Sequence, residues 1–212
     1  METILEIIQR ISFLAAMPAV AGIGVALGLL LILRRWQMHA LGMALLYFFV
    51  ALLHTRVIRP EVAVVKLLIG WMITMALYLT GRYLSERERE RTEEEEGPLV
   101  PRDAPFRGLL LVAVYTLAVG GSVRYPLPQV PGDVNLACYL LGVGGLVLMG
   151  LSEEPFRAGL GILTFLAGFD LLFGALEPSL VVAGLLGATN FLSALAVTYL
   201  AVTHVSKHEV EI

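Results

Sequence analysis

The sequence predicts an all-α integral membrane protein that crosses the membrane with about seven helices. The 212 residues are 58% hydrophobic and only 16% charged, whereas soluble domains carry roughly 25% charged residues. The charges are also clustered, since nearly half of the acidic residues lie between Glu86 and Asp103. The rest of the chain has too few charges to cover a water-exposed surface, so lipid is the expected solvent.

Seven apolar segments are long enough, or nearly so, to cross a membrane, because about 20 residues at 1.5 Å each span about 30 Å of hydrocarbon. In chain order they cover about 15–33, 39–54, 62–81, 107–123, 134–151, 156–176 and 180–203. Residues 1–14 mix apolar and polar side chains. They fit either an amphipathic helix on the membrane surface or an early start of the first span.

The arginine and lysine content of the loops predicts the orientation, because cytoplasmic loops are enriched in both residues. The N-terminal side carries four of them: Arg10, Arg56, Arg59 and Arg124. The opposite side carries ten: Arg34, Arg35, Arg82, Arg87, Arg89, Arg91, Arg102, Arg107, Arg157 and Lys207. We therefore expect a multi-pass protein of the inner (plasma) membrane with its N-terminus outside and its C-terminus in the cytoplasm.

A charged cytoplasmic linker, 84–106, separates a three-helix block, 1–83, from a four-helix block, 107–212. The linker begins with residues of alternating sign, from Ser85 to Arg91, which can extend the third helix through pairs such as Glu86 with Arg89. Gly97-Pro98 ends any such helix. The linker fits either a solvated spacer or a docking strip for a cytoplasmic partner.

Several kinds of chemistry are not indicated by the sequence. The net charge of −3 argues against a nucleic-acid partner. A single cysteine, Cys138, forms no disulfide or cysteine-based metal site within one chain. His204 and His208 have the spacing of two metal ligands on a helix but lack a third. We therefore predict no catalytic residue, no metal and no cofactor.

Ionisable or strongly polar groups inside spans are costly, which makes them candidates for function. Asp170 and Lys66 lie about 10 Å and 7 Å inside the outer ends of their spans, so they could pair. Asn190 lies near the middle of the last span. The three residues are candidates for an ion path. The alternative is that Lys66 reaches the headgroups and that Asp170 and Asn190 make static polar contacts.

Two further residue types have a predicted place in the spans. His39 and His54 lie at opposite ends of the second span, and we expect both at the membrane interface. Small residues let helices approach closely. On that ground Gly24 and Gly28 of the first span and Gly142 and Gly145 of the fifth are expected to lie at helix contacts.

The chain also resembles itself at an offset of about 118 residues. Leu41-Gly42 matches Leu160-Gly161, a proline follows each match at Pro60 and Pro178, and the segment 64–70 matches 181–187. Either the apolar helices are alike by chance, or spans one to three and five to seven form two parallel three-helix repeats. In the second case the fourth span is the linker helix that restores the orientation.

This layout resembles the E subunit of formate-hydrogenlyase-type membrane hydrogenases (HyfE), which is similar to the three-helix NuoK subunit of complex I and the MrpC subunit of cation antiporters. The local resemblance runs from Phe156-Arg157-Ala158-Gly159-Leu160-Gly161 through Asp170 to Asn190. NuoK-type helices carry acidic residues near the bilayer centre. Here Asn190 stands at such a place, and Asp170 lies nearer the outer end.

The resemblance implies an accessory membrane subunit of a complex I-like or hydrogenase-like respiratory assembly, with no catalytic centre of its own. Such a subunit would support proton or cation translocation beside antiporter-like membrane subunits, and the redox centres would belong to other chains. The alternative function is a free-standing transporter or membrane scaffold without a redox link.

Overall fold

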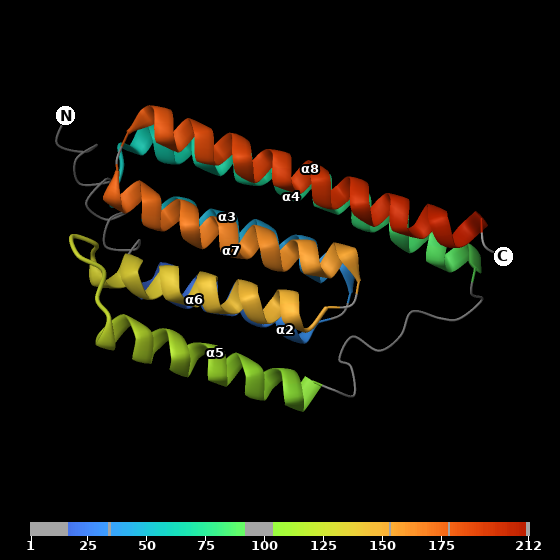
Figure 1. Cartoon of the computed structure of the whole chain (residues 1–212), viewed down its shortest axis with the longest axis horizontal. Coiled ribbons are helices and arrows are strands. Elements are labelled where there is room, and N and C mark those ends of the chain that lie inside the picture. The colour runs from blue at the N-terminus through green and yellow to red at the C-terminus, as the bar shows by residue number, and fades with distance from the viewer. Residues whose placement is uncertain (1–16, 34, 92–103, 153, 178, 211–212) are drawn as a thin grey trace.

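The computed structural model describes residues 17–33, 35–91, 104–152, 154–177 and 179–210, and these residues form seven α-helices and no strand (Figure 1). The helices are α2 (Met17–Ile32), α3 (Trp36–His54), α4 (Pro60–Arg91), α5 (Ala104–Arg124), α6 (Gly132–Gly150), α7 (Pro155–Leu176) and α8 (Leu180–Val210). Each predicted span coincides with one helix. The two candidate structures for residues 1–14 fall outside the described residues.

Six of the seven helices are long and apolar enough to cross a membrane, and α2, with 16 described residues, is shorter. Large apolar side chains such as Leu68, Val112 and Leu185 are exposed on α4, α5 and α8. Soluble proteins rarely expose apolar surface on this scale. The helices therefore fit a multi-pass membrane protein.

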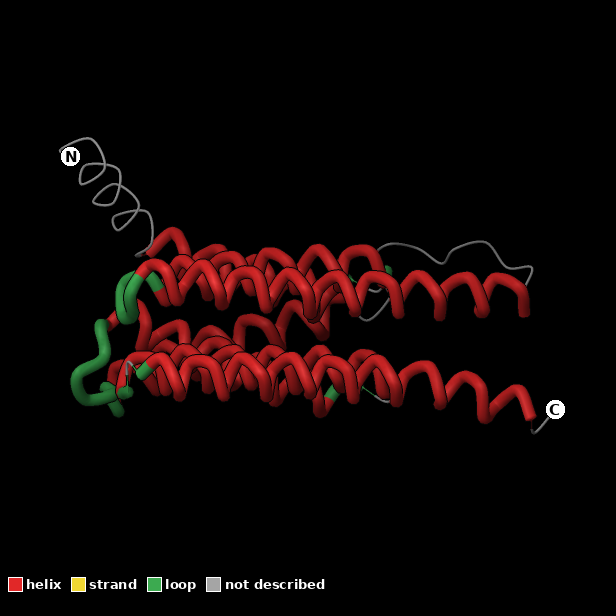
Figure 2. The backbone as a smooth tube through the Cα atoms, turned by 90° about the horizontal axis from the view of Figure 1, so that it is seen from above, coloured by secondary structure: helices red, strands yellow, loops and turns green. Residues whose placement is uncertain are grey.

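The helices form two layers of three, with α5 at one edge (Figures 1 and 2). One layer contains α2, α3 and α4 in order, and the other contains α6, α7 and α8. Across the layers α2 contacts α6, α3 contacts α7 and α4 contacts α8, whereas α5 packs mainly against α2 and α6. The predicted three-helix and four-helix blocks thus pack together as one bundle.

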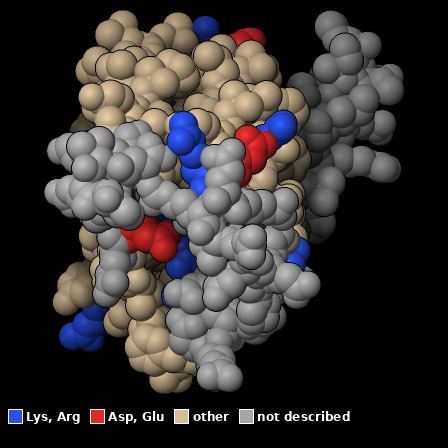
Figure 3. All heavy atoms as spheres, turned by 90° about the vertical axis from the view of Figure 1, so that its right-hand side faces the viewer, with Lys and Arg blue, Asp and Glu red and all other residues tan. Residues whose placement is uncertain are grey.

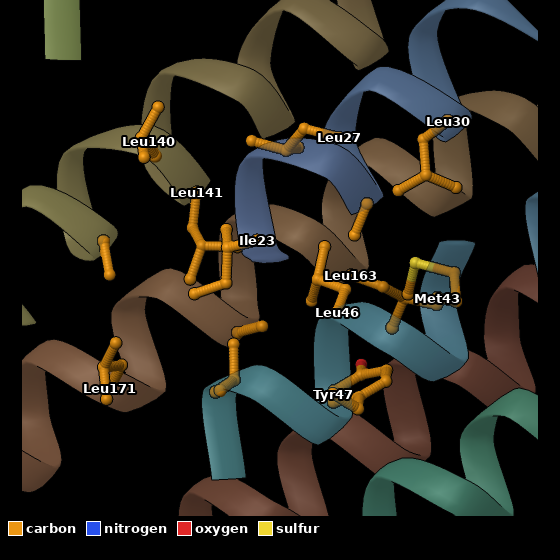
Figure 4. Packing of buried hydrophobic residues seen from close by; sticks show 14 of the residues in the cluster. Ile23, Leu27, Leu30, Met43, Leu46, Tyr47, Leu140, Leu141, Leu163 and Leu171 are labelled. Atoms are coloured by element: carbon orange, nitrogen blue, oxygen red, sulfur yellow. The ribbon is translucent and has the colours of Figure 1, made fainter. Parts of the chain in front are cut away.

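The core lies between the two layers. Ile23 and Leu27 of α2 and Leu140 and Leu141 of α6 are fully buried there, and Leu163 of α7 packs in the same cluster (Figure 4). The outer surfaces of α4 and α8 remain apolar and exposed. The middle of the bundle is therefore a packed interior, while its flanks are suited to contact with lipid.

The two ends of the bundle differ in how far their helices extend. We call the end with the loop 125–131 the proximal face, and the opposite end the distal face. At the distal face α4 and α8 project beyond the other helices (Figure 2). Arg82 and Glu86 form an exposed ion pair on the α4 projection, at 2.8 Å, and Figure 3 shows charged side chains grouped at this end. The predicted linker thus begins as helix, through Arg91, and its residues 104–106 already belong to α5.

Contacts inside the two layers match one another at the offset that aligns Leu41-Gly42 with Leu160-Gly161. A Cβ on Gly42 of α3 would lie 3.0 Å from the Leu30 side chain of α2. A Cβ on Gly161 of α7 would lie 2.7 Å from the Met149 side chain of α6. Leu30 and Met149 are themselves aligned by that offset. The same helix contact therefore recurs at corresponding positions.

In a second pair of corresponding contacts, the glycine and the bulky residue have changed places between the two layers. In the first layer, a Cβ on Gly22 of α2 would lie 2.4 Å from the ring of Phe49 in α3. In the second layer, the glycine is Gly168 of α7, whose Cβ would lie 2.8 Å from the Cβ of Leu141 in α6. Leu141 is aligned with Gly22, and Gly168 with Phe49. Each layer thus places one glycine against one bulky residue, in opposite order.

The predicted packing glycines have mixed outcomes. A Cβ on Gly24 would overlap the Tyr115 hydroxyl of α5, and one on Gly145 would lie 2.6 Å from the backbone nitrogen of Phe165 in α7. Gly28 is tight, with Leu111 at 3.3 Å. A Cβ on Gly142 would meet no atom within 4 Å, but the Gly142 backbone nitrogen lies 3.3 Å from a Cβ built on Gly168 of α7.

Candidate functional site

A buried ion pair joins the two layers of the bundle. The Lys66 amine of α4 donates a hydrogen bond to Oδ1 of Asp170 in α7, and the two residues are 9% and 5% exposed. Both lie about six residues from the proximal ends of their helices, or roughly 9 Å deep. Two charges at this depth persist only because each compensates the other. The alternative prediction, that Lys66 extends to the headgroups, is wrong.

His54 of α3 is the third ionisable member of the site. Its Nδ1 lies 2.9 Å from the carbonyl oxygen of Val50, and because a carbonyl oxygen only accepts hydrogen bonds, Nδ1 carries a proton. Nε2 then faces Oδ2 of Asp170 at 3.8 Å, which is too long for a direct hydrogen bond. An additional proton can be held on either of these two facing atoms.

A small cavity lies among these groups. Its volume is about 10 Å³, and its lining includes Lys66, Asp170, His54, Tyr47 of α3 and Asn190 of α8. That volume is roughly what a single water needs. The Tyr47 hydroxyl and the His54 Nε2 have no hydrogen-bond partner among the described residues. The cavity therefore offers one water several polar neighbours, within reach of both sites that can take a proton.

The three predicted ion-path residues, Asp170, Lys66 and Asn190, thus line one cavity, while their role stays a prediction. His54 and Tyr47 were missed as members of the site. Both occur in an otherwise apolar span and are seven residues apart, so they share a helix face. That spacing was the signal available in the sequence.

The two histidines of α3 do not face the membrane interface as predicted, since His39 is 3% exposed and His54 1%. His39 lines a second small cavity near the distal face, together with Arg107 of α5 and Arg157 of α7. Arg107 donates a hydrogen bond to the carbonyl oxygen of Leu31 at 3.0 Å, which ties α5 to the end of α2. This second cluster is cationic and lies far from Asp170 along α7.

No group of three histidine, cysteine, aspartate or glutamate side chains able to hold a metal ion occurs in the described part of the chain. The side chain of His208, one of the two histidines with metal-ligand spacing, is outside the described set. The ionisable side chains that the structure brings together at the site are those of Asp170, Lys66 and His54.

Comparisons with models of protein families, with curated proteins and with solved structures find no match for this chain. The resemblance to hydrogenase and complex I membrane subunits stays a prediction.

Proposed function

We propose that this chain is a non-catalytic membrane subunit of a complex I-like or hydrogenase-like assembly, in which its buried cluster supports proton or cation translocation. The observation that carries the proposal is the Lys66–Asp170 ion pair with His54 beside it, around a cavity of about the size of one water. Ionisable groups in an apolar bundle are costly, and their usual use is in ion and proton paths.

The cluster has the chemistry that a proton site needs. With Lys66 charged, Asp170 ionised and His54 neutral, the group is electrically balanced. Adding one proton, at His54 Nε2 or Asp170 Oδ2, weakens the hold of Asp170 on Lys66 or creates a second cation. The state of the cluster therefore changes with each proton gained or lost, and the change acts across α3, α4 and α7.

We further propose that α2–α4 and α6–α8 are two NuoK-like repeats joined by the linker helix α5. The pairing of corresponding helices across the layers supports this proposal, and so do the matched contacts of Gly42 and Gly161. In this arrangement Lys66 and His54 come from the first repeat, and Asp170 and Asn190 from the second. The cluster thus lies at the interface between the repeats.

A free-standing transporter is the second candidate function. The position of the cluster favours it, because transporters built from repeats place their sites at the repeat interface. Purification in mild detergent separates the two candidates. We expect other membrane subunits to co-purify with the chain, and no ion flux when the chain alone is placed in liposomes. A single pure species that conducts ions would favour the transporter.

The Asp170→Asn variant tests the role of the cluster, because it keeps the size and hydrogen bonding of the side chain but removes its titration. We expect proton pumping by the intact assembly in native membranes to fall while the assembly is recovered in normal amount. Asp133→Asn is the matched control, since Asp133 pairs with Arg56 near the proximal face, at 3.0 Å. Unchanged proton pumping in the Asp170→Asn variant would contradict the proton role and leave the cluster as a static structural contact.

A further inference from the structure

A groove leads from the proximal face toward the cluster. It lies between the first turns of α4 and α8 and has a volume of about 310 Å³. Its walls are mainly apolar and include Val65 and Ala183, and the exposed residues Arg59 and Glu61 contribute to its lining at the start of α4. Gly184 keeps it open on the α8 side, because a Cβ there would meet no atom within 4 Å.

The groove and the small cavity meet at two residues. Lys66 and Ile69 line both spaces, so these side chains form the wall between them. The Lys66 side chain has a flexible four-carbon stem, and its amine can turn between Asp170 on one side and the groove on the other. Movement of the Lys66 amine into the groove would remove one of the two side chains that separate the spaces.

On the distal side of the cluster, the described residues are closely packed and mainly apolar. Ile73 of α4 closes the cavity on that side. Beyond it the described interior is filled by fully buried apolar residues such as Leu46 of α3 and Leu163 of α7 (Figure 4). Ala194 of α8 is fully buried as well. Thr164 is the next polar residue along α7, and its hydroxyl is bonded to the carbonyl oxygen of Leu160. A file of waters would have to displace these buried side chains.

We propose that water and protons reach the cluster only from the proximal face, through the groove between α4 and α8, and that the route ends at the cluster. The ionisable groups that they meet there are Lys66 of α4, Asp170 of α7, and His54 and Tyr47 of α3. This proposal names the side of the membrane from which protons would reach the cluster. It bears on ion translocation only if the proposed function holds. Onward transfer then requires a rearrangement of the bundle or groups on a neighbouring subunit.

Thiol accessibility tests the route in the full chain, in sealed native membranes of each orientation. The only native cysteine, Cys138, is replaced by alanine in every variant. Gly184→Cys reports on the groove, Ile69→Cys on the wall shared by groove and cavity, and Ala194→Cys on the apolar interior of the same bundle. The probe is a charged, membrane-impermeant methanethiosulfonate.

We expect Gly184→Cys and Ile69→Cys to be modified from the proximal face only, and Ala194→Cys to be modified from neither face. Modification of Ile69→Cys from the distal face, or of Ala194→Cys from either, would overturn the one-sided route. So would an Ile69→Cys that is protected from both faces while Gly184→Cys reacts.

Ile69 packs against Gly187 of α8, so a second reporter guards against a variant that fails to fold. Lys66→Cys in an Asp170→Asn background removes both charges together and places the thiol at the same wall, with the same expected result. The two proposals fail separately: one-sided access can be absent while Asp170→Asn still abolishes pumping, and pumping can be insensitive to Asp170 while the groove is accessible.

Discussion

Asp170 is a buried carboxylate that faces ionisable side chains from two other helices. It faces the Lys66 amine with one carboxylate oxygen and the His54 ring with the other. A carboxylate in an apolar bundle is stable only when it is compensated, and the compensation here comes from Lys66 of α4. Loss of either charge leaves the other buried and unpaired, whereas removal of both relieves the burial cost of the pair.

For this reason we expect Lys66→Met to destabilise the fold by about 3–5 kcal/mol, the usual cost of breaking one side of a buried ion pair. Adding Asp170→Leu should recover most of that loss, because two apolar side chains then occupy the place of the pair. The measurement is thermal unfolding of the purified chain in a mild detergent. A double variant as unstable as Lys66→Met would show that the pair itself, and not the unpaired charge, sets the stability.

At the scale of helices, glycines decide how closely neighbours approach. Gly145 of α6 and Gly161 of α7 face each other's backbone, since a Cβ on either would lie 2.8 Å from the carbonyl oxygen of the other. The α2–α3 pair uses Ala26 and Gly42 at the aligned positions. The slightly larger alanine is accommodated there, with its carbonyl oxygen 3.4 Å from a Cβ built on Gly42.

The exchanged contact gives a prediction for these helix pairs. Gly22→Leu should destabilise by about 1–3 kcal/mol, because it forces a side chain against the Phe49 ring. Phe49→Gly should also destabilise, by leaving that space empty. The double variant copies the Leu141–Gly168 arrangement of α6 and α7, and we expect it to be more stable than the sum of the single effects by about 0.5–3 kcal/mol.

Unfolding of the four proteins of this double-mutant cycle, followed by thermal denaturation in detergent, provides the measurement. Strict additivity of the two single effects would contradict the matched packing of the layers.

Sequence reasoning located the helices because their length and apolar composition are set by the lipid solvent. It also placed Lys66 and Asp170 at similar depth, since depth depends only on position along a helix. It could not tell which side of each helix faces inward, because helices in lipid are apolar all round. His54 and Tyr47 were therefore not assigned to the site. Those outcomes depend on packing between helices distant in sequence.

The whole bundle has a predicted direction in the membrane, with the proximal face outside and the distal face in the cytoplasm. We expect an impermeant thiol reagent added to intact cells to label Tyr125→Cys, near the proximal loop, and to leave Glu86→Cys unlabelled, because Glu86 lies on the distal projection of α4. Both residues are exposed, and Cys138→Ala serves as the background. Labelling of Glu86→Cys in intact cells would invert the orientation, and with it the side from which the groove opens.

The depth of the cluster sets how much of the membrane voltage a proton crosses on its way to Asp170. Asp170 lies roughly 9 Å along its helix from the proximal end, which is about a third of a hydrocarbon thickness of about 30 Å. Moving one elementary charge across the full membrane voltage is worth about 2.3 kcal/mol per 100 mV. If the field falls evenly, a proton that enters through the groove and stops at Asp170 gains or loses about 0.8 kcal/mol per 100 mV. Occupancy of the cluster would then follow the membrane voltage as well as the proton concentration at the proximal face.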